Sequence, residues 1–197
     1  MNHQTRTSFS RWAAALLLTG LSGTAAAHTF GAAGAGFAEG LAHPFVGLDH
    51  LLAMIGVGLW AAQSGGRALW QLPLAFLSVM ACGAWLGQAG PDWSGAEIMI
   101  ALSVVALGVL VALSARPAGW VGIGLVSLFA LFHGYAHGQE IPQAAAPVTY
   151  AAGFLLATLI LHLIGLGLGL SISRLQAASR VGGLAMAATG VYLLASL

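Results

Sequence analysis

Residues 147–171 read PVTYAAGFLLATLILHLIGLGLGLS, a continuous apolar run that contains no Asp, Glu, Lys or Arg. A helix needs about 20 apolar residues to cross the hydrocarbon core of a bilayer, so this run predicts a transmembrane helix. It lacks the sustained polar and apolar alternation that a strand of an outer-membrane barrel shows. The stretch therefore predicts an all-α membrane fold.

Similar stretches lie on both sides of this run and are separated by short segments rich in Gly, Pro, Ser or Arg. They cover residues 44–63, 70–89, 95–115, 119–137 and 179–196. Of the 197 residues, 59% are hydrophobic and 6% are charged, and the mean hydropathy is +0.91. These values exceed what a soluble core of this length requires. We predict a polytopic membrane helix bundle with about six transmembrane helices, and no soluble domain in its loops.

The charged residues and the single cysteine exclude several classes of partner and site. The chain has a net charge of +1 and contains no lysine, so it offers no basic patch for a nucleic acid. Cys82 is the one cysteine, which excludes an internal disulfide and any thiolate-rich zinc or iron–sulfur site. The partners that we expect are the lipid bilayer and a small ligand, while the oligomeric state stays open.

Residues 1–27 resemble a signal peptide. Arg6 and Arg11 precede a short apolar core at residues 13–18, and a run of alanines at residues 25–27 offers a cleavage site. A retained first helix is the alternative, but the apolar core is short for a membrane span. We predict cleavage after Ala27, which leaves residues 28–197 as one transmembrane domain. The α-amino group and imidazole of His28 would then make it an accessory metal ligand.

The arginines of the predicted mature chain lie in alternate connections between the spans, at Arg67, Arg116, Arg174 and Arg180. The opposite connections carry acidic residues and no basic residue. The positive-inside rule therefore places the arginines in the cytoplasm. We expect a multi-pass protein of the bacterial cytoplasmic membrane with a periplasmic mature N-terminus.

Two histidine-rich segments stand at the ends of apolar stretches, and the first is His43-Pro-Phe-Val-Gly-Leu-Asp49-His50. Pro44 suits the first position of a helix, which makes His43 a cap-like residue. On a regular helix His43 and His50 would share one face about 10 Å apart, with room at Gly47 for an ion or a partner helix. Asp49 would point roughly 100° away from His50, as a ligand or as the group that orients a histidine.

The second segment is Phe132-His133-Gly-Tyr-Ala-His137-Gly-Gln-Glu140. His133 and His137 are four positions apart and can contact one ion from a single helix face, with Glu140 continuing the stripe. The predicted topology puts both segments and Glu97 in the extracytoplasmic half. Glu97 is equally well explained as a charge that favours a helix N-terminus. We interpret His162, which has no polar neighbour in sequence, as an interhelical hydrogen bond.

Imidazole and carboxylate donors suit nickel, cobalt, zinc or copper(II) better than calcium or magnesium. A copper(I) path would need paired thioethers, and the methionines are scattered over different predicted spans. Ionisable groups are costly in hydrocarbon, so a shared ligand for the two segments is expected. The donors indicate a divalent ion of borderline softness.

The two segments resemble the motifs of the HupE/UreJ family of bacterial nickel permeases. The first motif continues as Leu-Leu-Ala-Met-Ile-Gly-Val-Gly-Leu-Trp-Ala-Ala to position 62. The resemblance implies secondary uptake of nickel, or of cobalt in some members, that supplies hydrogenase or urease maturation. It also implies that the transport residues are those of the two motifs: His43, Asp49, His50, His133, His137 and Glu140.

We therefore expect a transporter and not an enzyme, with Ni2+ or Co2+ as its substrate and no permanent cofactor. The chain has no Gly-rich phosphate loop of the Walker type, which excludes ATP hydrolysis by the chain itself. Two alternatives stay open. One is an intramembrane zinc-dependent hydrolase that uses the same residues. The other is a metal-binding sensor or assembly subunit that moves no ions.

Overall fold

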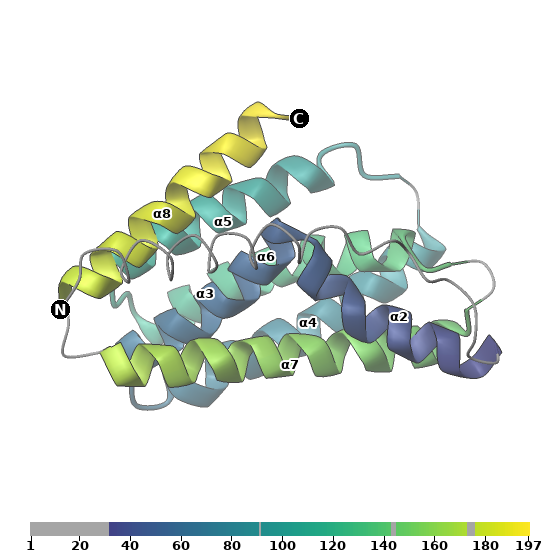
Figure 1. Cartoon of the computed structure of the whole chain (residues 1–197), viewed down its shortest axis with the longest axis horizontal. Helices are drawn as coiled ribbons and strands as arrows, with labels where there is room; N and C mark the ends of the chain where they lie inside the picture. Colours follow the sequence, from purple (N-terminus) through teal and green to yellow (C-terminus); the bar gives the residue numbers. More distant parts are fainter. Residues whose placement is uncertain (1–31, 91, 143–144, 173–175) are drawn as a thin grey trace, which may run out of the picture. The chain divides into compact units, whose positions relative to one another are not determined.

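The computed structural model describes residues 32–90, 92–142, 145–172 and 176–197. The chain divides into two units, residues 1–30 and 31–197, and the described residues all belong to the second. The predicted signal peptide and His28 lie outside the described residues. Within them the chain forms seven α-helices and no strand (Figure 1). The helices are α2 (Ala32–Val46), α3 (Leu48–Ser64), α4 (Ala68–Ala89), α5 (Ala96–Ala112), α6 (Gly119–Gln139), α7 (Pro147–Ile172) and α8 (Gln176–Ala195).

The all-α prediction agrees with the described part of the chain, whereas the predicted number of spans is not confirmed. Four helices are long and apolar enough to cross a membrane, namely α4, α6, α7 and α8. The bent pair α2 and α3 makes a fifth if it counts as one span. Helix α5 falls on a predicted stretch but has only 17 residues. Helix α2 was not expected from the sequence.

The predicted regular helix through the first histidine segment is wrong. His43 and Pro44 lie inside α2, which ends at Val46, and α3 starts at Leu48 with a bend of 80° between the two helices. Gly47 at the break is extended, with φ −76° and ψ 115°. Pro44 has no N–H to donate to the preceding turn, which weakens α2 near its end. His43 is therefore not a helix cap, and it does not share a helix face with His50.

Glycines let the helices that carry the histidines approach their neighbours closely. The main pairs are α4 with α6, α3 with α7, α2 with α7, and α5 with α8. Each histidine of the second motif is followed by a glycine against α4: a Cβ at Gly134 would overlap the carbonyl oxygen of Met80, and a Cβ at Gly138 that of Ala84. This small-residue packing brings helix backbones into contact in membrane proteins. It sets the depth of the α6 histidines relative to α4.

The two ends of the bundle differ in charge. Arg67 and Arg116 line one cavity of about 320 Å³. Arg116 precedes α6 and Glu140 follows it, so the basic cavity and Glu140 lie at opposite ends of this helix. This separation agrees with the alternation of arginines in the sequence.

Candidate metal site

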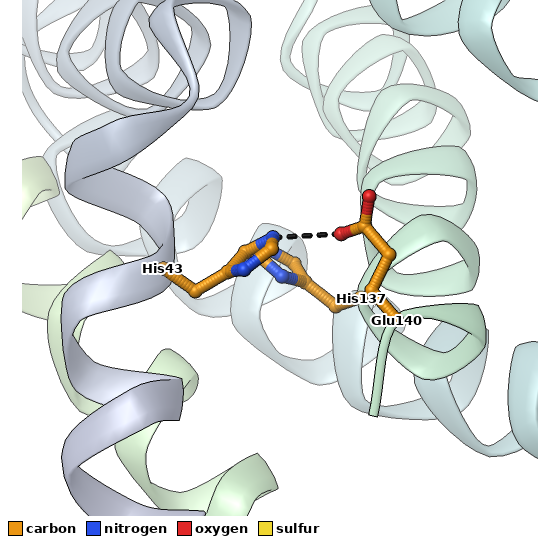
Figure 2. A group of neighbouring side chains, drawn as sticks. All are labelled: His43, His137 and Glu140. Carbon is orange, nitrogen blue, oxygen red and sulfur yellow. Dashed lines mark ion pairs between the residues drawn. The ribbon is translucent and has the colours of Figure 1, made fainter. Parts of the chain in front are cut away.

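An outer group of three side chains joins the two histidine segments. His43 comes from the last turn of α2, His137 from the last turn of α6, and Glu140 from the residue that ends α6. One ligand atom from each lies within 4.8 Å of the others, and His43 Nε2 is 2.7 Å from Glu140 Oε2. Figure 2 shows the side chains from the two helices pointing toward one another. A nitrogen, nitrogen and oxygen set of this size fits a divalent transition metal.

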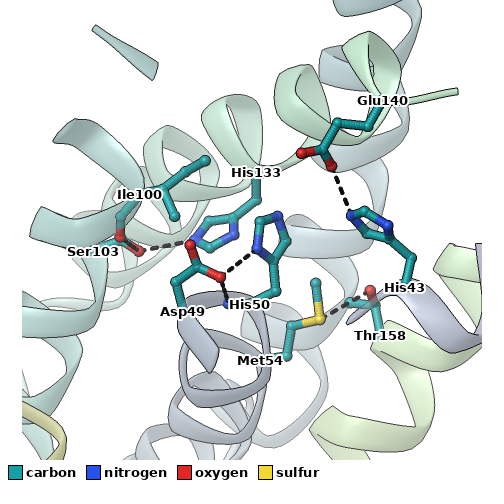
Figure 3. A network of polar contacts seen from close by, with 9 residues as sticks. All are labelled: His43, Asp49, His50, Met54, Ile100, Ser103, His133, Glu140 and Thr158. Carbon is teal, nitrogen blue, oxygen red and sulfur yellow. Dashed lines mark hydrogen bonds and ion pairs between the residues drawn. The ribbon is translucent and has the colours of Figure 1, made fainter. Parts of the chain in front are cut away.

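His50 lies directly beside this group, at the start of α3. Its ring centroid is 4.6 Å from that of His137 and 4.7 Å from that of His133. Asp49 Oδ1 accepts hydrogen bonds from both the backbone N–H and the Nδ1 of His50, each at 2.7 Å (Figure 3). Because a carboxylate only accepts, the proton of the neutral ring is on Nδ1. His50 Nε2 is buried, has no partner in the described part of the chain, and keeps its lone pair.

Gly47 makes room for this pair. A Cβ at Gly47 would lie 2.9 Å from Asp49 Oδ1 and 3.2 Å from His50 Nδ1. The sequence suggested that this glycine accommodates an ion or a partner helix. The geometry instead shows a glycine that accommodates the hydrogen bond orienting His50.

His133 is held from its other side by α5. Ser103 Oγ donates to the Ile100 carbonyl at 2.6 Å and lies 2.9 Å from His133 Nε2. Since the single hydroxyl proton is used on Ile100, Ser103 must accept from His133, and the neutral ring then carries its proton on Nε2. His133 Nδ1 is left buried without a hydrogen-bond partner among the described residues. The bond to Ser103 therefore leaves Nδ1 of His133 unprotonated, and the bond to Asp49 leaves Nε2 of His50 unprotonated.

His137 is the most unusual member of the cluster. Its side chain is 0% exposed, and its ring stacks on that of Phe154 with the centroids 4.7 Å apart. Neither of its ring nitrogens has a hydrogen-bond partner in the part of the chain that the structure describes. Buried polar groups nearly always have partners, because leaving one unpaired costs about 1–3 kcal/mol. The unpaired nitrogens of His50, His133 and His137 lie in one region, where a single divalent ion could bond to them.

A cavity of about 230 Å³ lies next to the outer group, and its lining includes Asp92, Glu97 and Glu140. Carboxylates at a cavity wall raise the local concentration of cations. The hydrogen bond with His43 lowers the pKa of Glu140, against an opposing effect of burial, so this carboxylate stays ionised at neutral pH. Glu97 thus faces the mouth of the site and is not one of the three residues of the outer group.

The structure brings the predicted residues of the two segments together. The outer group combines His43 of α2 with His137 and Glu140, and His133 lies beside His50. Whether His133 and His137 share one ion stays a prediction. Three residues of the site were missed, namely Ser103, Phe154 and Tyr150, whose ring centroid is 6.1 Å from that of His43. Ser103 is the one hydroxyl in the apolar sequence of α5, which is a weak signal. Tyr150 and Phe154 lie in an apolar run and carry no signal in the sequence.

Comparisons with known proteins agree with the motifs. The sequence model of the family described as HupE / UreJ protein matches residues 16–193. Protein HupE of Rhizobium leguminosarum bv. viciae is 47% identical over 161 residues, which cover 81% of this chain and 84% of that protein. No solved structure matches the chain significantly. Because the family match spans nearly the whole chain and includes both histidine motifs, this chain belongs to the HupE/UreJ family.

Proposed function

We propose that this chain is a secondary transporter that imports Ni2+, or Co2+, across the bacterial cytoplasmic membrane for hydrogenase or urease maturation. The observation that carries the proposal is the set of buried, unpaired ring nitrogens on His50, His133 and His137 beside the His43–Glu140 pair. Membership of the HupE/UreJ family and the apolar helices support it. Neutral imidazoles are good ligands for nickel and cobalt.

The arrangement suggests how an ion would be captured. Carboxylates at the cavity wall attract the cation. The ion then inserts between His43 Nε2 and Glu140 Oε2, which lie 2.7 Å apart in this structure. His137 supplies the next nitrogen. The ring centroid of His50 lies within 5 Å of those of His137 and His133. The ion can therefore exchange its histidine ligands one at a time. Stepwise exchange avoids a fully desolvated ion in the bundle.

The charges at the ends of the bundle support import as the direction of transport. The arginines Arg67 and Arg116 would face the cytoplasm, and the acidic cavity would then open to the periplasm. In this orientation the ion enters from outside and leaves at the basic end.

The test is the flux of radiolabelled nickel into cells and into liposomes that contain the purified protein, with cobalt and zinc as competitors. We expect nickel to accumulate with the wild-type chain and not with protein-free liposomes. Binding of nickel without flux would contradict transport and favour the sensor or assembly subunit. Turnover of a lipid or peptide substrate without flux would favour the zinc-dependent hydrolase.

Replacing Asp49 by Asn is expected to lower nickel uptake about 10- to 100-fold, the usual cost of losing the group that orients a metal-binding histidine. The amide keeps the size of the side chain but removes the charge on the Nδ1 partner of His50. Glu39→Gln removes the same charge from an exposed side chain and should leave uptake unchanged. Equal uptake by the Asp49 and Glu39 variants, at matched protein levels, would show that the Asp49–His50 bond has no role.

Nickel uptake is expected to fall as the pH drops from about 7.5 to about 5.5, because protons compete for the imidazole nitrogens. The lowered pKa of Glu140 keeps its carboxylate charged through this interval, since it binds a proton only at more acidic pH. Among the residues of the outer group, the fall is therefore assigned to histidine. Initial rates in liposomes with a fixed internal pH measure this effect, and constant rates from about pH 5 to 8 would contradict ligation by histidine.

A further inference from the structure

A second group of metal-binding side chains lies in the bundle outside the cluster described above. Met54 of α3, Met80 of α4, and Thr158 and His162 of α7 are each 0–1% exposed. The Thr158 hydroxyl is 3.2 Å from Met54 Sδ and 3.6 Å from Met80 Sδ. Figure 3 shows the Met54 sulfur turned toward Thr158. The methionines are scattered in the sequence, yet two thioethers meet at one hydroxyl.

His162 lies beside this group, one helical turn after Thr158 on α7, and it has an unpaired nitrogen. Its Nδ1 is 2.8 Å from the Met54 carbonyl oxygen, which can only accept, so Nδ1 carries the proton. The interhelical hydrogen bond predicted from the sequence is confirmed. It leaves Nε2 with a lone pair, buried and without a partner among the described residues.

The second group is close to the first. Met54 follows His50 by one helical turn on α3, and Thr158 and His162 are one turn apart on α7. The ring centroid of Phe76 is 5.9 Å from that of His133 and 5.1 Å from that of His162, so one aromatic ring contacts both groups. The two groups are therefore neighbours in the bundle.

We propose that Met54, Met80, Thr158 and His162 form an inner metal site. It takes a divalent transition-metal ion from the histidine cluster of His43, His50, His133 and His137. The site offers one imidazole, two thioethers and one hydroxyl, all uncharged. Calcium and magnesium need several oxygen ligands, frequently carboxylates, and would find only one oxygen here. Nickel, cobalt and copper accept nitrogen and sulfur. The inner site thus selects transition metals against the more abundant alkaline-earth ions.

The site itself depends only on these side chains, whereas its place on a path rests on the proposed transport function. The weak hydroxyl–sulfur contacts are easily replaced by bonds to an ion, because a thioether is a poor hydrogen-bond acceptor.

X-ray absorption at the nickel edge on the purified full-length protein, together with equilibrium dialysis, tests the site. Saturated wild type should show a sulfur neighbour of nickel and bind more nickel than the double variant Met54→Leu/Met80→Leu. That variant should lack the sulfur signal and still load the histidine cluster. Leu conserves the volume of Met, so folding should be preserved. No sulfur signal in the wild type at saturation would overturn the proposal.

The variant His162→Asn tests whether His162 binds the metal or only holds α7 against α3. The Asn amide can still donate to the Met54 carbonyl but has no nitrogen in place of Nε2. We expect this variant to bind less nickel than wild type and to show slower flux in liposomes. Wild-type binding and flux in this variant would overturn the inner site and leave transport intact. Conversely, a sulfur signal in a wild-type protein that moves no nickel would support the site and contradict transport.

Discussion

His137→Phe is expected to lower nickel uptake by at least about 100-fold, because loss of a direct ligand should exceed the cost of losing a group that only orients one. The new ring can keep the stacking on Phe154 and fills the same space, so the variant loses the nitrogens and little else. His137 belongs to the outer group and also contacts His50, so it links the two halves of the cluster. Uptake at matched protein levels in the membrane measures the effect.

The same substitution should lower uptake but should not lower the stability of the protein. Without metal, the unfolding temperature of His137→Phe should equal or exceed that of the wild type, because two unpaired buried nitrogens are removed. Added nickel should raise the unfolding temperature of the wild type by more than that of the variant, since a bound ligand stabilises the folded state and the variant has lost a ligand of the histidine cluster. A less stable variant without metal would mean that His137 has a structural role, and wild-type uptake would contradict ligation.

The double variant Gly134→Ala/Gly138→Ala is expected to give the largest loss of stability. Each new Cβ would overlap a carbonyl oxygen of α4, at Met80 and at Ala84. Overpacking typically costs about 1–3 kcal/mol per site, and here the overlapping atoms are backbone, which cannot rotate away. For a domain of this size we expect the unfolding temperature to fall by about 5–15 °C. Thermal unfolding of the purified protein in detergent measures the change.

Gly124→Ala is the matched control for this variant. Gly124 lies on the same helix, and a Cβ there would meet nothing within 4 Å. Alanine is the better helix former by about 0.5–1 kcal/mol, so this variant should be as stable as the wild type or slightly more stable. If alanine at Gly124 lowered the unfolding temperature as much as alanine at Gly134 and Gly138, the loss of stability would come from α6 itself and not from its contact with α4. Nickel uptake should fall only in the double variant, because its α6 histidines are displaced.

Much of the candidate site could be predicted because its signals are local. His43, Asp49, His50, His133, His137 and Glu140 stand out in sequence, since ionisable side chains are rare in apolar stretches. The pairing of these residues could not be predicted from a regular helix. The chain bends by 80° at Gly47, between His43 and His50, so the spacing of a regular helix does not hold across this segment.

The sequence by itself determined that this protein is all-α, apolar enough to cross a membrane several times, and equipped with two histidine segments of the HupE/UreJ kind. Hydropathy and short motifs depend only on neighbouring residues, so they can be interpreted without a structure. Only the tertiary structure decided that Ser103 selects the free nitrogen of His133, and that Met54 and Met80 meet at Thr158. These contacts join residues on different helices, and the close approach of glycine-lined backbones sets the depth at which they meet.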